Sequence, residues 1–180
     1  MNSPRRIEIG TGEFLVRAHE IWDQGWFLLT SGDFEARSFN TMTVSWGSFG
    51  TIWNRPFAQV VVRPTRHTYQ FMERHETFTL SAFPEACRPA LEILGSRSGR
   101  DGDKIAEAGL TPIASTQVAS PGFDEAHLII ECRKIYSDDL RPARFVDPTI
   151  DEHYPKKDYH RFYFGEIVAV RGTEAFRSIR

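Results

Sequence analysis

Two short segments of the chain carry the side chains best suited to hold a ligand. Residues 40–47 place hydroxyl and amide groups at the edge of an apolar run, and residues 63–69 hold two arginines, a histidine and two threonines. Hydroxyls, free backbone N–H groups and guanidinium forks all donate hydrogen bonds to the oxygens of a phosphate. Trp46 and nearby phenylalanines suit a flat aromatic ring. These features predict a phosphorylated planar cofactor, and flavin mononucleotide (FMN) is the first candidate.

The arginines of the second segment favour phosphate binding. One arginine after an apolar strand is commonly a solvated edge charge, but Arg63 and Arg66 lie three residues apart on either side of Pro64. Pro64 restricts the backbone and limits the entropy lost when the turn is ordered. Thr68 stands at the start of a predicted helix, where a hydroxyl and free N–H groups favour an anion.

The first segment has two interpretations. Alternate residues of a strand face opposite sides, which separates Thr41, Thr43 and Ser45 from Met42, Val44 and Trp46. Spacing alone favours a half-exposed strand with a polar outer face. Gly47, which has no side chain, would instead let a ring approach the backbone closely.

Strand patterns outnumber helix patterns along the chain. Apolar runs and alternation predict strands at residues 26–30, closed by a turn at 31–33, and at 42–46, 57–63, 76–83, 126–133 and 162–170. Short helices are predicted at residues 68–74 with Thr68 as the cap, at 89–94 ending at Gly95, and at 103–108 ending at Gly109. This order indicates a mainly β fold, an antiparallel barrel with short helices. The polar residues 137–160 are predicted to form a surface excursion, a cover or an interface element.

Length and composition limit the class of protein. A chain of 180 residues predicts a single domain, 1–180, and a net charge of -2 argues against a nucleic-acid partner. No segment approaches the roughly 20 apolar residues of a membrane span, so no membrane anchor is expected. The charged residues 1–8 are not followed by an apolar run, so no secretory signal is expected. Cys87 and Cys132 are expected to be reduced, buried thiols of a cytoplasmic protein. The scattered histidines and cysteines predict no metal site.

Several motifs occur in an order that carries a family resemblance. Asn-Thr-Met-Thr-Val-Ser-Trp at residues 40–46 is followed by Arg-Pro-Thr-Arg-His-Thr at residues 63–68. Further matches stand at residues 78–81, 96–104, 108–111, 128–133 and 160–167. In this order they resemble the flavin reductase-like family, the FMN-binding split barrels that include flavoredoxin. The likeness runs from about residue 25 to residue 170.

The resemblance implies a six-stranded antiparallel split barrel of the Greek-key type, paired as a homodimer that holds FMN noncovalently near the subunit interface. The isoalloxazine edge would lie along residues 40–45 with Trp46 close by, Ser81 and Phe83 would line the ring, and Lys104 would approach the phosphate. A solvated helix lysine is the alternative for Lys104. The cofactor-binding residues implied in this way are Asn40, Thr41, Met42, Thr43, Ser45, Trp46, Gly47, Arg63, Pro64, Arg66, Thr68, Ser81, Phe83 and Lys104.

The implied activity is that of an oxidoreductase of the flavin reductase type. FMN would carry the hydride chemistry, and NAD(P)H would dock transiently, because neither a Gly-x-Gly-x-x-Gly turn nor a Walker loop is present. His160 is the predicted catalytic residue, since family members often place a histidine there, near the nicotinamide or the flavin; a partly buried structural histidine is the alternative. Two other functions stay open: a flavoredoxin-like electron carrier with a protein redox partner, and a flavin-binding module without catalysis.

Overall fold

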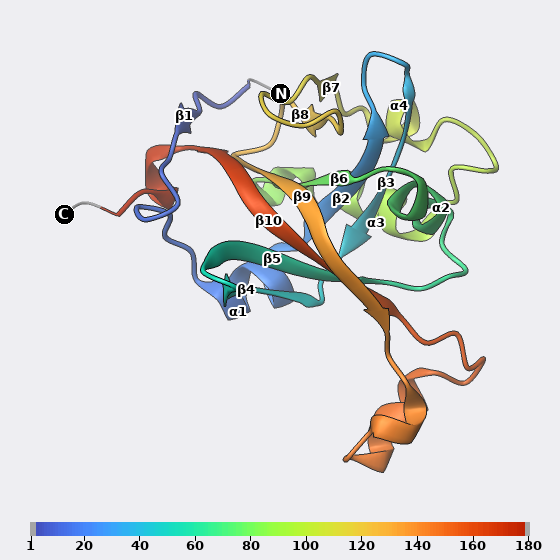
Figure 1. The fold of residues 1–180 in the computed structure, drawn as a ribbon. Helices are drawn as coiled ribbons and strands as arrows, with labels where there is room; N and C mark the ends of the chain where they lie inside the picture. The colour runs from blue at the N-terminus through green and yellow to red at the C-terminus, as the bar shows by residue number, and fades with distance from the viewer. Residues whose placement is uncertain (1–2, 179–180) are drawn as a thin grey trace.

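An antiparallel sheet of eight strands dominates residues 3–178, the part of the chain that this computed structural model describes (Figure 1). Both ends of the expected 1–180 domain lie outside the described residues. The strands are β1 (Ile7–Glu8), β2 (Phe27–Asp33), β3 (Ser38–Val44), β4 (Gly47–Ile52), β5 (Arg55–Val62), β6 (Thr77–Ala82), β9 (Leu128–Asp139) and β10 (Arg161–Gly172). Their order is β3-β2-β6-β9-β10-β5-β4, with β1 paired to β10. A second small sheet pairs β7 (Pro112–Ile113) with β8 (Gly122–Phe123).

The mainly β class expected from the sequence is confirmed, and the six predicted strands correspond to β2, β3, β5, β6, β9 and β10. The sequence does not predict β4, whose residues Gly-Ser-Phe-Gly-Thr-Ile carry little strand pattern. It forms as a hairpin with β5 through Trp53 and Asn54, whose φ angles are 50° and 58°. Positive φ at both turn residues matches the twist of the two strands that the turn joins.

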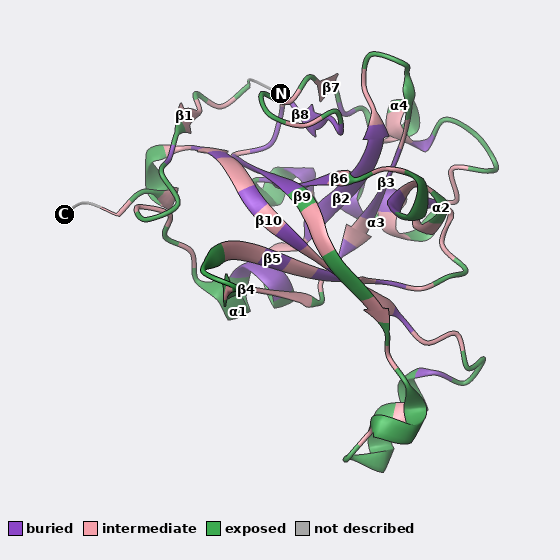
Figure 2. Cartoon of the chain, viewed as in Figure 1, coloured by how far each residue is buried: buried purple, intermediate pink, exposed green. Residues whose placement is uncertain are grey.

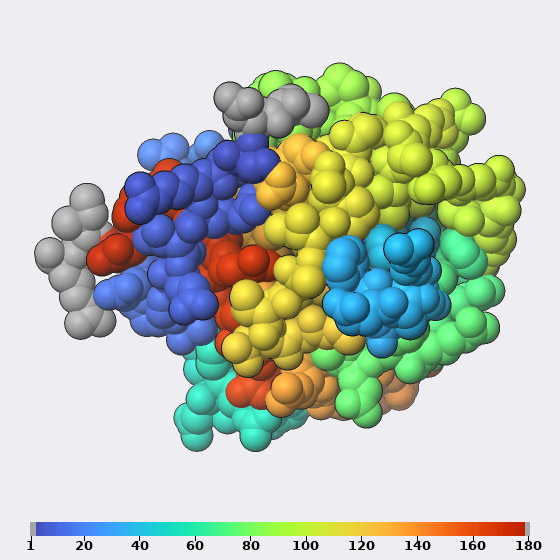
Figure 3. All heavy atoms as spheres, turned by 90° about the horizontal axis from the view of Figure 1, so that it is seen from above, coloured from blue at the N-terminus to red at the C-terminus, as the bar shows by residue number. Residues whose placement is uncertain are grey.

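The turn predicted at residues 31–33 is wrong, because β2 continues through Asp33. Gly32, with φ of 138°, lies so close to β3 that a Cβ there would collide with the backbone of Phe39. The glycine therefore permits close strand pairing, and the chain reverses later, at residues 34–37. In space this reversal packs against residues 112–124 (Figure 3), where the N–H of Phe34 donates to the carbonyl of Ala119.

Short helices fill the connections between the strands. They are α1 (Ala18–Glu20), the π-helical turn η1 (Ile21–Gly25), α2 (His67–Arg74), α3 (Arg88–Ser96), α4 (Lys104–Ala108) and the 3-10 turns η2 (Glu85–Cys87), η3 (Pro142–Arg144), η4 (Pro148–His153) and η5 (Glu174–Phe176). The α4 prediction is confirmed: Asp103 accepts hydrogen bonds from the first N–H groups, and Gly109 ends the helix at φ of 66°. Over residues 3–178, no helix has the length and apolar character needed to cross a membrane.

Two helix-end predictions are wrong. Gly95 lies inside α3, where its missing side chain matters for packing, since a Cβ would lie 3.2 Å from the Cβ of Thr43 on β3. Thr68 does not cap α2, because the residue preceding the helix is Arg66 and makes no capping hydrogen bond. Thr68 is instead buried in the first helical turn.

The core is buried on both faces of the sheet (Figure 2). Leu29 belongs to the main cluster inside the curved sheet, while Leu28 belongs to a second cluster between the sheet and α3. Both faces of β2 are therefore covered, which explains its continuous apolar run. Cys87 and Cys132 are both buried, as expected.

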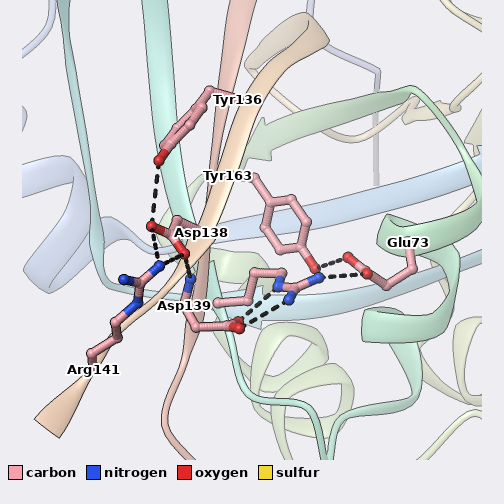
Figure 4. Close-up of polar contacts among 7 residues, drawn as sticks. Glu73, Tyr136, Asp138, Asp139, Arg141 and Tyr163 are labelled. Carbon is pink, nitrogen blue, oxygen red and sulfur yellow. Dashed lines mark hydrogen bonds and ion pairs between the residues drawn. The ribbon is translucent and has the colours of Figure 1, made fainter.

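The predicted excursion is a lobe that projects from the sheet between the end of β9 and the start of β10 (Figure 1). Residues 137–139 still belong to β9, so the lobe begins at Leu140 rather than at residue 137. Side-chain contacts fasten its base to α2: the Tyr163 hydroxyl and Arg161 Nη1 each donate to Glu73 at 2.7 Å, and Arg161 also pairs with Asp139 (Figure 4). Two residues beyond the end of β9, Arg141 donates to both carboxylate oxygens of Asp138. The lobe therefore leaves the sheet from a firmly held base.

Candidate functional site

A pocket opens where β3 ends, beside the end of β5 and the start of β10. Its volume is about 210 Å³. The lining residues are Met42, Thr43, Val44, Ser45, Trp46, Val61, Arg63, Arg66 and His160. The fold thus brings the two segments singled out in the sequence to one place, together with His160. We call the side at residues 42–46 the ring half, and the side at Arg66 the phosphate half.

In the ring half, the polar face of β3 is covered by protein. Thr41 is buried and shares a hydrogen bond of 2.9 Å with Thr30, and the hydroxyl of Thr43 donates to the carbonyl of Leu91 on α3. The half-exposed polar face favoured by spacing is therefore wrong, because α3 lies across it. Only the strand end stays open: Trp46 is 47% exposed, and Ser45 makes no side-chain hydrogen bond within residues 3–178.

The phosphate half brings the buried Lys104 and the half-buried Arg66 to the C-terminal end of α3. Arg66 Nη2 donates to the carbonyl of Gly95 at 2.6 Å. Lys104 Nζ donates to the carbonyls of Leu94 at 3.1 Å and Arg97 at 3.2 Å. These carbonyls lack helical partners, and the helix dipole adds negative potential there, so the end of α3 stabilises both cations.

The charges of this cluster are not compensated. Among the described residues, neither Arg66 nor Lys104 has a carboxylate within ion-pair distance. Burial, followed by the neighbouring Arg66, lowers the pKa of Lys104 to about 8, and burial and Arg63 lower the pKa of Arg66. His67 Nδ1 is buried without a hydrogen-bond partner, and burial and nearby cations lower the pKa of its ring. An anion would relieve all three, because buried charges and polar groups are stable only when partnered.

Asn40 and Thr68 brace this half rather than open into the pocket. Asn40 Nδ2 donates to Thr68 Oγ1 at 2.7 Å, and both side chains are buried. At Gly99, a Cβ would collide with the amide oxygen of Asn40 and lie 3.1 Å from the ring of His67. Neither His67 nor Gly99 is among the residues predicted to bind the cofactor, although both stand in the matching segments 63–68 and 96–104.

Arg63 lines the pocket, but its guanidinium contacts the lobe. It pairs with Asp158 at 2.9 Å, donates to the carbonyl of His153 at 2.9 Å, and lies 4.9 Å above the ring of Tyr154. His160 is 8% exposed and lies 5.3 Å from the ring of Trp46. Burial, followed by the charge of Arg63, lowers the pKa of His160 to about 4, so its ring is neutral at pH 7.

A sequence model described as a flavin reductase like domain matches residues 22–178, which is most of the chain. The chain belongs to this family. The family resemblance seen in the sequence is thereby confirmed. No curated protein matches the sequence.

Solved structures agree with the flavin reductase-like assignment. An FMN-binding domain of a flavin reductases-like enzyme from Shewanella baltica OS155 is 16% identical, with 96% of this chain and 79% of that chain covered and a TM-score of 0.66. Flavoredoxin of Desulfovibrio vulgaris (Miyazaki F) is 23% identical, with 94% and 78% covered and a TM-score of 0.65. The NADH:FAD oxidoreductase SgcE6 of Streptomyces globisporus C-1027 is 15% identical, with 87% and 81% covered and a TM-score of 0.63. These likenesses confirm the split-barrel fold, whose main sheet has eight strands in the described residues, where six were expected.

Eight of the expected residues do not line the pocket: besides Asn40, Thr41, Thr68 and Lys104, described above, these are Gly47, Pro64, Ser81 and Phe83. Ser81 is buried on β6, and Phe83 packs in the second core cluster, so neither reaches the pocket lining. At Gly47, a Cβ would collide with the ring of Trp22, so the missing side chain makes room for Trp22. Pro64 lies in a turn in which the N–H of Arg66 donates to the carbonyl of Arg63 at 3.0 Å, and it shapes the approach to the site without lining it.

Proposed function

We propose that this flavin reductase-like protein binds FMN noncovalently at the end of β3 and transfers electrons from NAD(P)H to flavin. The observation that carries the proposal is the uncompensated cationic cluster at the end of α3, beside a pocket edged by the half-exposed Trp46. A phosphate would supply the missing negative charge, and a flat ring would cover Trp46. The names of the Shewanella domain and of an FMN-binding protein from Thermus thermophilus also support FMN.

Each side chain has a role in this proposal. Arg66 and Lys104 bind the phosphate, while Asn40 and Thr68 hold the wall behind them. Ser45 and the backbone of residues 42–45 contact the ring edge, and Trp46 and His160 shield it from water. The bound flavin supplies the hydride chemistry, and the protein supplies orientation and hydrogen bonds. The NADH:FAD oxidoreductase among the neighbours supports a nicotinamide donor.

A homodimer would complete the site. The pocket of about 210 Å³ is smaller than the roughly 300–1,000 Å³ of most ligand sites, so much of a bound FMN would extend beyond one chain. Trp53 and Tyr136 are 60% and 45% exposed, with ring centres 6.1 Å apart, and Tyr136 also contacts Phe162 and Phe164. Exposed aromatic patches of this kind are typical of protein interfaces. We place the activity in the cytoplasm, in keeping with two buried thiols.

A flavoredoxin-like carrier is the second candidate, because the flavoredoxin from Desulfovibrio is 23% identical and covers 94% of this chain. Such a carrier would keep its FMN and exchange electrons with a protein partner. Its steady-state NAD(P)H oxidation with free FMN would be nearly absent.

The test is an absorbance titration of the purified protein with FMN, followed by anaerobic NADH and NADPH additions. A reductase shows a perturbed flavin band, loses it on addition of one nicotinamide, and turns over with free FMN. Binding without reduction by either nicotinamide favours the carrier, or a flavin-binding module if no protein donor reduces it. A spectrum that stays that of free FMN throughout the titration overturns the whole proposal.

A further inference from the structure

Tyr154 reaches back from the projecting lobe to the pocket. Between residues 140 and 160, only Tyr154 and His160 are buried, and Tyr154 is 2% exposed. Its hydroxyl lies 2.8 Å from Nδ1 of His160. The one buried side chain of the lobe proper is therefore used to contact a pocket residue.

The direction of the Tyr154–His160 hydrogen bond follows from the partners available to the buried Tyr154 hydroxyl. Within residues 3–178 the Tyr154 oxygen has no hydrogen-bond partner other than His160, so its hydrogen has only Nδ1 to bond to. Burial raises the pKa of Tyr154, so the hydroxyl keeps that hydrogen. A neutral imidazole has one donor and one acceptor nitrogen. Tyr154 therefore donates to Nδ1, and the proton of His160 resides on Nε2.

The other nitrogen of His160 is left for a ligand. Nε2 has no hydrogen-bond partner among the described residues. It is not fully buried, since it is absent from the buried polar atoms that lack a partner. Since His160 lines the pocket beside Trp46, this free edge of the ring opens into the pocket. A neutral ring with its proton on Nε2 can donate one hydrogen bond there.

We propose that Tyr154 is a positioning residue that fixes His160 in the Nε2–H tautomer, so that His160 donates a hydrogen bond to a ligand in the pocket. Arg63 supports the arrangement, because it lies over the Tyr154 ring and ties the lobe down through Asp158. The acceptor would be a carbonyl oxygen or a ring nitrogen of flavin, and this identification rests on the proposed function. A donor at that place stabilises negative charge that develops on the ring during reduction.

The first test reads the tautomer in protein without FMN. Long-range ¹⁵N–¹H NMR of the histidine rings, with His160 assigned from the spectrum of His160→Gln, is expected to show a protonated Nε2 and an unprotonated Nδ1. Tyr154→Phe is expected to shift the Nδ1 signal. Tyr159→Phe is the matched control, because Tyr159 contacts the Tyr154 ring at 4.9 Å but its hydroxyl bonds to Asp151. A proton on Nδ1 in the unaltered protein overturns the proposal.

The second test reads the consequence in the FMN-loaded protein. Tyr154→Phe is expected to slow flavin reduction about threefold to tenfold, the worth of one hydrogen bond, with the nicotinamide KM within about twofold. It is also expected to lower the flavin midpoint potential, whereas Tyr159→Phe changes neither. An unchanged rate and potential in Tyr154→Phe overturns the positioning role while the proposed function stands. A protein that binds no FMN overturns the proposed function, and the tautomer measurement then decides the role of Tyr154.

Discussion

The phosphate half and the ring half of the pocket differ in how completely one chain builds them. In the phosphate half, Arg66 and Lys104 already bond to carbonyls at the end of α3, and His67 Nδ1 is buried without a partner. In the ring half, Ser45 has no side-chain hydrogen bond among the described residues, and Trp46 is half exposed. One half is assembled in advance, and the other is open.

The difference follows from what stabilises each half. Taking a cation out of water is costly, but the free carbonyls and the dipole at the end of α3 offset part of that cost for Lys104 and Arg66 before any ligand binds. The open strand end leaves room for a ring, a nicotinamide or a second subunit. We therefore expect the phosphate half to set affinity and the ring half to set chemistry.

Replacing Arg66 is expected to have the largest effect on FMN binding of the changes considered. Arg66→Ala is expected to weaken FMN binding about 10-fold to 150-fold, because a charged hydrogen bond contributes about 1.5–3 kcal/mol. Riboflavin, which lacks the phosphate, is expected to bind as before. Fluorescence titrations with both flavins measure this, and Arg55→Ala, an exposed arginine paired with Glu166, controls for lost charge. Equal losses for both flavins would remove Arg66 from the phosphate site.

The pKa of Lys104 gives the second prediction. Its pKa of about 8 in the free protein means that the lysine loses its proton above that pH, whereas a bound phosphate favours the charged form and raises the pKa. FMN binding then takes up a proton, and affinity is expected to fall about tenfold between pH 7 and pH 9. Calorimetry in buffers of different ionisation enthalpy detects the proton. Lys104→Arg stays charged and is expected to abolish the fall; a fall that persists in this variant contradicts the assignment.

The sequence predicts the sheet well, since alternation in β6 and apolar runs in β2 and β5 arise from local side-chain patterns. It misses β4, whose pairing depends on the conformation of Trp53 and Asn54 rather than on its own residues.

The candidate site divides in the same way. Arg66 and Trp46 stand in contiguous motifs and are predicted, whereas the contact of Tyr154 with His160 exists only because the lobe folds back. The contact of α3 with Thr43 is likewise a tertiary contact. The alternation of residues along a strand does not show which element covers each face.

Trp46→Ala tests the ring half. An aromatic contact contributes about 0.5–1.5 kcal/mol, so affinity is expected to fall about threefold to tenfold, equally for FMN and riboflavin. The deciding measurement is the ratio of the FMN affinity to the riboflavin affinity. Arg66→Ala is the comparison variant, because it is expected to change that ratio. A selective loss of FMN would mean that Trp46 acts on the phosphate and that the two halves are not separate.

The smallest expected effect concerns salt. Interactions of exposed charges weaken as the Debye length falls from about 10 Å at 0.1 M to about 3 Å at 1 M, but buried pairs are screened much less. Because Arg66 and Lys104 are held at the end of α3, FMN affinity is expected to fall only about twofold to threefold between those concentrations. Riboflavin affinity measured alongside corrects for effects of salt on the ring. A much steeper loss of FMN affinity would mean that the phosphate binds outside the pocket, at the exposed Arg97. The phosphate half would then be no more preassembled than the ring half.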